Sequence, residues 1–173
     1  KPRFKLLADV TKADLRALGL MKDSLVFSGK ADLDFTSTNI DNFLGTARIS
    51  DATLHRNERR LSFDSLNVAA GYNESGIKTL SASSNEFRAN LTGNYALNEL
   101  PSVVNYFLHR YYPNSIRPPK KLTRDQSFDY DIETYYVDDY LQLINPKLTG
   151  FNNTSLKGRL DISGGKLDMD LNV

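Results

Sequence analysis

The chain has 173 residues, of which 22 are lysine or arginine and 21 are aspartate or glutamate, so its formal net charge is only +1. This balance argues against a nucleic-acid-binding protein, because such proteins carry a clustered surplus of positive charge. The absence of cysteine excludes disulfides and thiolate metal sites, and no apolar run approaches the ~20 residues that cross a bilayer as a helix. We expect residues 1–173 to form one fragment of a longer protein.

Apolar and polar residues alternate along most of the chain, a pattern typical of β-strands with one covered face. Two short helical turns are expected between the first strands, one begun by Thr11–Asp14 and ended at Gly19, the other over residues 39–44. Asn73–Gly76 has the composition of a hairpin turn. The expected strands are, in chain order, residues 4–10, 25–35, 47–49, 61–68, 77–82, 87–97, 128–132, 156–162 and 167–173.

A different pattern near residues 101–112 predicts a helix. Val104, Phe107, Leu108 and Tyr111 recur at the i, i+3, i+4, i+7 spacing of one helical face. A last helical turn is expected over residues 140–146.

Residues 113–127 are expected to form a flexible linker, because they combine prolines with a basic run that includes Lys120, Lys121 and Arg124. The alternative for this segment is a weak contact with anionic lipid, worth at most ~1 kcal/mol per basic residue.

The pattern apolar-x-Gly-x-apolar-x-apolar occurs four times in the alternating segments, with its glycine at Gly29, Gly45, Gly93 and Gly158. Glycine weakens a strand, so these placements need a physical reason. One interpretation is local bending of a curved sheet. The other is that the glycines open space on the inner face for a ligand.

Candidate catalytic groups have simpler explanations. His55 and His109 lack partners at metal-ligand spacing, and Asp129, Asp131 and Glu133 alternate along one strand, which puts them together on its solvated face. We therefore predict that the protein is not an enzyme and has no catalytic, cofactor-binding or metal site.

Five stretches of the second half resemble the TamB-like proteins of the AsmA-like superfamily, the translocation and assembly module proteins of Gram-negative envelopes. They are 87–95 (FRANLTGNY), 101–104 (PSVV), 128–132 (FDYDI), 141–148 (LQLINPKL) and 156–160 (LKGRL). The first half is similar in style, and the family brings no catalytic residues to carry over.

The resemblance implies a mainly β protein: an elongated, curved antiparallel sheet, or β-taco, with a hydrophobic concave face and short helices. It implies a periplasmic segment of a protein anchored in the inner membrane outside this fragment. The groove would carry phospholipid acyl chains between the inner and outer membranes and support outer-membrane biogenesis. A β-barrel assembly protein would be a partner through regions outside the fragment, and no cofactor is implied.

The residues expected to line the lipid groove share apolar side chains on the alternating face of the strands. They are Phe27, Leu33, Phe87, Leu91, Tyr95, Leu97, Phe128, Tyr130, Ile132, Leu156, Leu160, Ile162, Leu167, Met169 and Leu171.

The alternative interpretation is an ordinary β-sandwich or barrel whose inner faces pack on each other. Such a protein would be a non-catalytic binding or scaffold module of the cell envelope that binds protein or glycan. The nine tyrosines and nine phenylalanines suit glycan binding, but the chain has no tryptophan, the strongest sugar-stacking residue.

Overall fold

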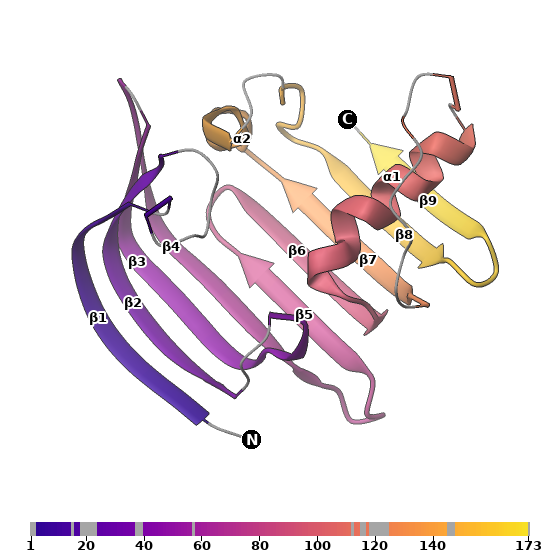
Figure 1. Ribbon diagram of the computed structural model, residues 1–173, viewed down its shortest axis with the longest axis horizontal. Helices are drawn as coiled ribbons and strands as arrows, with labels where there is room; N and C mark the ends of the chain where they lie inside the picture. The colour runs from indigo at the N-terminus through magenta and orange to yellow at the C-terminus, as the bar shows by residue number, and fades with distance from the viewer. Residues whose placement is uncertain are drawn as a thin grey trace.

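A single antiparallel sheet of nine strands, hydrogen-bonded in sequence order from β1 to β9, makes up most of the protein (Figure 1). The computed structural model describes residues 3–14, 16–17, 24–36, 40–56, 58–111, 113–114, 117, 125–144 and 148–172. The strands are β1 (Arg3–Asp14), β2 (Val26–Thr36), β3 (Leu44–Arg56), β4 (Arg59–Tyr72), β5 (Lys78–Ser83), β6 (Phe87–Asn94), β7 (Ser127–Thr134), β8 (Ser155–Asp161) and β9 (Lys166–Asn172).

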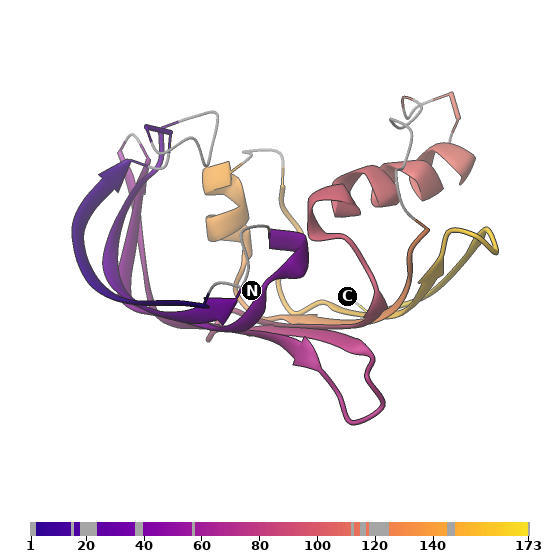
Figure 2. The ribbon, with the colours of Figure 1, turned by 60° about the horizontal axis from the view of Figure 1, so that its bottom comes forward.

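Within the described residues, four short helical segments accompany the sheet. They are the 3-10 turns η1 (Ile40–Asn42) and η2 (Leu97–Glu99) and the helices α1 (Leu100–Tyr111) and α2 (Asp138–Ile144). Figure 2 shows that the sheet is curled and that both α-helices lie on its inner side. The mainly β fold, the helix near 101–112 and the turns near 39–44 and 140–146 are confirmed. The alternative of a β-sandwich is not confirmed, because the described strands form one sheet.

The hairpin between β4 and β5 follows the local chemistry expected of its sequence. The Asn73 side-chain oxygen accepts hydrogen bonds from the backbone N–H of Ser75 (3.0 Å) and of Ile77 (2.9 Å). Gly76 has a φ of +72°, a left-handed conformation that glycine adopts without strain. Asparagine and glycine therefore fix the turn, as predicted.

Side chains connect helix α2 to the segment before β8 and to the sheet. The Asn152 side-chain oxygen accepts from the backbone N–H groups of Val137 (2.8 Å) and Asp138 (3.1 Å) at the start of the helix. The Tyr140 ring lies edge-on to Phe63 of β4, with the ring centres 6.5 Å apart. The Leu143 side chain of α2 is only 2% exposed, so it is buried.

The helical turn expected to begin at Thr11–Asp14 is wrong over those four residues, because they extend β1. Ala13 pairs with Phe27 and Asp14 with Val26, after a bulge that follows Val10. Pairing with β2 outweighs the local helix-start signal. The remainder of that turn, up to Gly19, falls mostly outside the described residues.

The strand expected over residues 87–97 is too long, because β6 ends at Asn94. Asn94 pairs with Ser127, the first residue of β7, so the ladder has no partner beyond it. Instead, the backbone N–H of Ala96 donates to the buried Gln126 side chain at 2.9 Å. Leu97, an expected strand residue, begins η2.

The linker expected over residues 113–127 lies largely outside the described residues. At its C-terminal end, the Gln126 side chain is 1% exposed and donates to Glu99 at 3.0 Å. Ser127 already belongs to β7.

Candidate functional site

One continuous row of apolar side chains crosses all nine strands. Because each strand pairs with the next and the bulges of β1 and β2 lie outside this region, the members of this row lie side by side on one face of the sheet. Row A consists of Leu6, Leu33, Ala47, Val68, Ala82, Ala89, Ile132, Leu156 and Leu171. With strands ~4.8 Å apart, row A is roughly 38 Å long.

A second row runs beside row A, two residues away along each strand. Row B consists of Phe4, Phe35, Gly45, Ala70, Leu80, Leu91, Tyr130, Gly158 and Met169. It is apolar except for the Tyr130 hydroxyl. Two parallel rows of this kind make a strip of apolar surface instead of isolated contacts.

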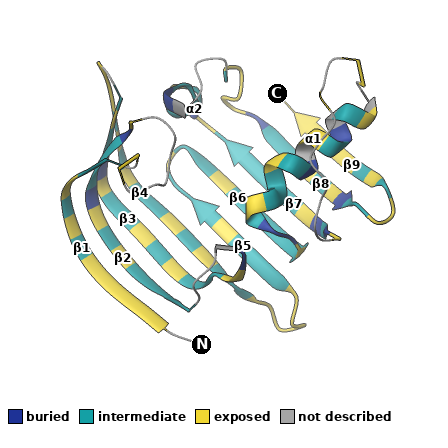
Figure 3. Ribbon diagram, viewed as in Figure 1, coloured by how far each residue is buried: buried dark blue, intermediate teal, exposed yellow. Residues whose placement is uncertain are grey.

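Rows A and B are not sealed in a core. No residue of either row is fully buried; the members on β2 to β8 are half-buried, and those on β1 and β9 are exposed. Leu6 is 50% exposed and Leu171 is 53% exposed. Figure 3 shows the same distribution, with most of the sheet coloured as half-buried or exposed. The strip is therefore exposed at its two edges and partly covered in between.

The opposite face of the same strands is polar. Lys157 lies 3.2 Å from Asp131 and 3.5 Å from Glu133, and Arg159 lies 3.2 Å from Asp129. The three carboxylates thus share the solvated face, as their spacing predicted. Such exposed ion pairs stabilise neighbouring strands by small amounts.

Helix α1 covers the part of the apolar face that does become a closed core. Val103 and Phe107 of α1 are 0% and 2% exposed and pack with Tyr95, Phe128 and Leu160. Leu80, Leu91, Tyr130 and Leu167 are partly buried against this cluster. The helix therefore covers one side of the apolar face.

The fifteen residues expected in the groove fall into distinct places. Row A holds Leu33, Ile132, Leu156 and Leu171, and row B holds Leu91, Tyr130 and Met169. Tyr95, Phe128 and Leu160 are buried beneath α1, with Leu97, Ile162 and Leu167 packed around them. Phe27 pairs with Leu54 beyond the bulge of β2, and Phe87, the first residue of β6, pairs with Thr134.

Sequence reasoning missed more than half of rows A and B. Leu6, Val68 and Leu80 belong to them, and their alternating positions were visible in the sequence. What was absent was the register, which decides which strands align their apolar positions.

The strand glycines are explained by close backbone approach and not by an open space. A Cβ at Gly45, where φ is +135°, would lie 2.1 Å from the backbone oxygen of Asp34. A Cβ at Gly93, also at φ +135°, would lie 2.5 Å from the backbone oxygen of Ser127. The neighbouring strand occupies the space, which favours the bending interpretation.

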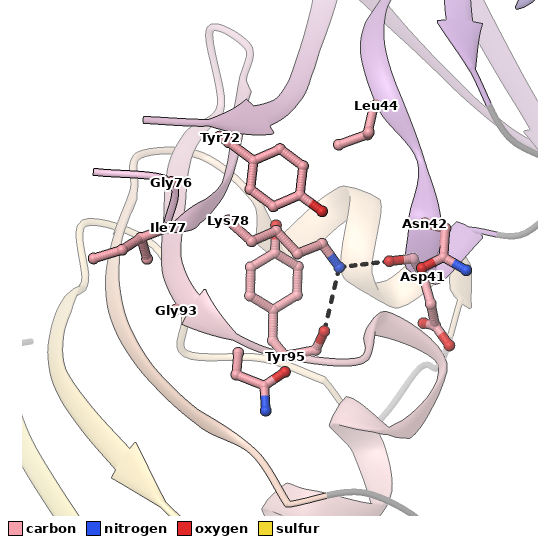
Figure 4. A pocket seen from close by; sticks show the side chains of 10 residues that line it. Asp41, Asn42, Leu44, Tyr72, Gly76, Ile77, Lys78, Gly93 and Tyr95 are labelled. Carbon is pink, nitrogen blue, oxygen red and sulfur yellow. Dashed lines mark hydrogen bonds between the residues drawn. The ribbon is translucent and has the colours of Figure 1, made fainter. Parts of the chain in front are cut away.

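An open pocket of about 410 Å³ lies where the β4–β5 hairpin, η1 and the end of β6 meet (Figure 4). Its lining includes Asp41, Tyr72, Ile77, Lys78, Asn94 and Tyr95. Nothing in the sequence pattern pointed to this pocket, because its residues come from segments separated by up to about fifty positions.

Lys78 is the cation of the pocket. Its ammonium group donates hydrogen bonds to the backbone oxygens of Asp41 and, at 3.3 Å, of Tyr95. It also lies 4.1 Å from the centre of the Tyr95 ring, where the face of the ring attracts a cation. These contacts hold the ammonium group at the pocket wall (Figure 4).

Tyr95 contributes a buried phenol. Its side chain is 3% exposed, and its hydroxyl has no hydrogen-bond partner within the part of the chain that the structure describes. Burial, with a smaller effect from Tyr72, raises the pKa of Tyr95 to about 12. The phenol is therefore a protonated hydrogen-bond donor at neutral pH.

No protein-family model matches the chain, and comparisons with curated proteins and with solved structures also find no match. Among the described residues, no helix is long and apolar enough to cross a membrane. The same residues contain no group of three or more side chains that could hold a metal ion.

Proposed function

We propose that this chain is a segment of a periplasmic, bridge-like protein that carries phospholipid acyl chains between the inner and outer membranes and supports outer-membrane biogenesis. The two apolar rows would line the concave side of the curled sheet and hold the acyl chains. The resemblance to TamB-like proteins supports this function. So does one structural observation, an apolar strip that crosses all nine strands and has no fully buried member.

The benefit of such a strip follows from the cost of moving a lipid through water. A phospholipid with on the order of thirty methylenes would need about 24 kcal/mol to leave its bilayer, at ~0.8 kcal/mol per methylene. That barrier corresponds to a rate on the order of 10⁻⁵ per second. An apolar strip removes most of the barrier, and it needs no reactive side chain.

The open edges of the sheet fit the same function. Among the described strands, β1 and β9 have a neighbour on one side only, and the exposed Leu6 and Leu171 lie at the two ends of row A. Further strands of a longer protein would continue the rows. In this proposal the inner-membrane anchor and the contact with a β-barrel partner lie outside the 173 residues.

The test is whether the chain, purified from bacteria, retains phospholipid, measured by native mass spectrometry. Val68→Asp places a charge in the middle of row A, and we expect it to lower the bound phospholipid at least fivefold. Asn67→Asp is the matched control, because the neighbouring residue is exposed on the opposite face; we expect it to retain lipid. Absence of phospholipid from the unsubstituted chain would refute the proposal.

A further inference from the structure

Next to row B, on β4 and β5, the apolar face of the sheet carries two polar side chains. On β4, Tyr72 lies two residues after Ala70 and therefore on the same face. On the antiparallel strand β5, Lys78 lies two residues before Leu80, also on that face. Ala70 and Leu80 belong to row B, and Tyr72 pairs directly with Lys78. A phenol and an ammonium group therefore lie directly beside the aliphatic side chains of row B.

Tyr72 and Lys78 both line the pocket described above. Its volume of about 410 Å³ would hold on the order of ten water molecules, at ~30 Å³ each. That is sufficient for a phosphate group with a small substituent. Because the pocket adjoins row B, a molecule with one polar end and an apolar tail could place the two ends on surfaces that suit them.

The pocket presents hydrogen-bond donors from three side chains. Lys78 provides an ammonium group, which binds phosphate as a point charge. Tyr72 is 61% exposed, and its side chain lines the pocket (Figure 4). The Tyr95 hydroxyl has no partner in the described chain. The Asp41 carboxylate also lines the pocket, and its Oδ1 accepts from the backbone N–H of Asn98 at 3.1 Å.

We propose that this pocket binds the phosphate group of an acyl lipid whose tails lie on rows A and B. Lys78 provides the charge, Tyr72 and Tyr95 donate hydrogen bonds, and the tails extend from the pocket onto Ala70 and Leu80. This inference rests on the proposed function and adds to it the chemical class of headgroup and the place where it binds.

The experiment compares three probes by isothermal titration calorimetry on the 173-residue chain: n-decyl phosphate, 1-decanol and inorganic phosphate. We expect decyl phosphate to bind at least tenfold more tightly than decanol, and inorganic phosphate to bind at least a hundredfold more weakly than decyl phosphate. Lys78→Gln is expected to remove the preference for decyl phosphate over decanol. Lys166→Gln, a charge-matched control at the start of β9, is expected to keep it.

Two further variants make the result independent of any effect of Lys78→Gln on folding. Lys78→Arg keeps the charge, and we expect the phosphate preference to remain within threefold. Tyr72→Phe removes one exposed donor, and we expect a twofold to fivefold loss of decyl phosphate affinity with decanol affinity unchanged. Circular dichroism checks that each variant folds.

The outcomes separate this inference from the proposed function. If decanol and decyl phosphate bind equally well, or if folded Lys78→Gln keeps the preference, the headgroup site is refuted and the apolar strip stands. If inorganic phosphate binds as tightly as decyl phosphate, the pocket is a site for free phosphate, and the lipid headgroup is refuted. If neither decanol nor decyl phosphate binds, the proposed function fails, and this inference fails with it.

Discussion

The hydroxyl of Tyr130 on β7 donates a hydrogen bond to the backbone oxygen of Asp168 on β9, 2.9 Å away. The ring therefore crosses β8, where Gly158 lies opposite Tyr130. A Cβ at Gly158 would lie 2.7 Å from the Tyr130 oxygen and 2.0 Å from the Asp168 oxygen. The aromatic side chain fills the space above the glycine, an arrangement that pins strand register.

This contact predicts that Gly158→Ala is strongly destabilising. The added methyl group must displace Tyr130 or β9, so we expect a loss of about 2 kcal/mol or more in the free energy of unfolding, measured by urea denaturation. Gly71→Ala is the matched control, because a Cβ there meets no atom within 4 Å. It should be neutral or stabilising by up to ~1 kcal/mol. Equal losses in the two variants would contradict the packing described for Gly158.

The adjacent residues Leu6 and Leu7 test the two faces of one strand. Leu6 pairs with Leu33 within row A, whereas Leu7 is 81% exposed and pairs with Asp32 on the polar face. We expect Leu6→Asp to lower phospholipid retention severalfold and Leu7→Asp to leave it unchanged, with unfolding free energies within ~0.5 kcal/mol of each other. Retention that falls equally in both would show that the apolar face has no special part in lipid binding.

Phe107→Ala tests how much of the stability comes from the core beneath α1. Phe107 is 2% exposed, so its truncation should cost about 3–5 kcal/mol in urea denaturation. Met169→Ala, at a 59% exposed position, should change stability by less than ~0.5 kcal/mol. If α1 detaches while the sheet persists, binding of a fluorescent apolar dye will rise because Phe128 and Leu160 become accessible. A loss below 1 kcal/mol for Phe107→Ala would contradict the closed core.

The pair of Glu133 and Arg88 predicts a dependence of stability on acid pH. The hydrogen bond from Arg88 is the main cause that holds the pKa of Glu133 below its usual value. A carboxyl group whose pKa is lowered by folding contributes stability above the ordinary glutamate range, and this contribution is lost as the pH falls through the lowered value. We expect the urea midpoint to fall from pH 5 to pH 3, and to fall less steeply in Arg88→Gln. Parallel pH profiles for the two proteins would rule out the coupling.

Tyr140 predicts a loss of stability as the pH rises into the alkaline range. Its pKa is raised to about 12, chiefly by burial and then by the charge of Glu86. Because the folded pKa lies above the value of the unfolded chain, stability is complete below pH ~10 and is lost progressively as the pH rises toward 12. Tyr140→Phe should lose about 1 kcal/mol at pH 7, since it gives up the 2.7 Å hydrogen bond to the backbone oxygen of Ser62. Its urea midpoint should then change less between pH 9 and pH 11.5, and an unchanged slope would contradict this assignment.

The strands and helix α1 were predictable because their signals are local. Alternating residues such as Phe128, Tyr130 and Ile132 identify a strand without knowledge of its neighbours, and the apolar spacing around Phe107 identifies a helix. The solvated face of Asp129 and Glu133 followed from the same alternation.

Features that depend on pairing were not predictable from one sequence. Thr11–Asp14 carries a helix-start signal, yet β2 draws it into the sheet. Tyr95 continues the alternation of β6 but is buried under α1, because β7 offers no partner beyond Ser127. The pocket at Lys78 exists only because η1 and the β4–β5 hairpin meet in space.

The strict neighbour-to-neighbour strand order has a consequence for how the protein is made. From β2 onward, each strand pairs with the strand synthesised just before it, so each hairpin can close as it leaves the ribosome. The longest delay between two successive strands is the one between β6 and β7. Here α1 and the residues after it must be synthesised before Ser127 can pair with Asn94. A nascent chain that pauses there already holds a six-stranded sheet, with the β6 edge ready to receive the remainder.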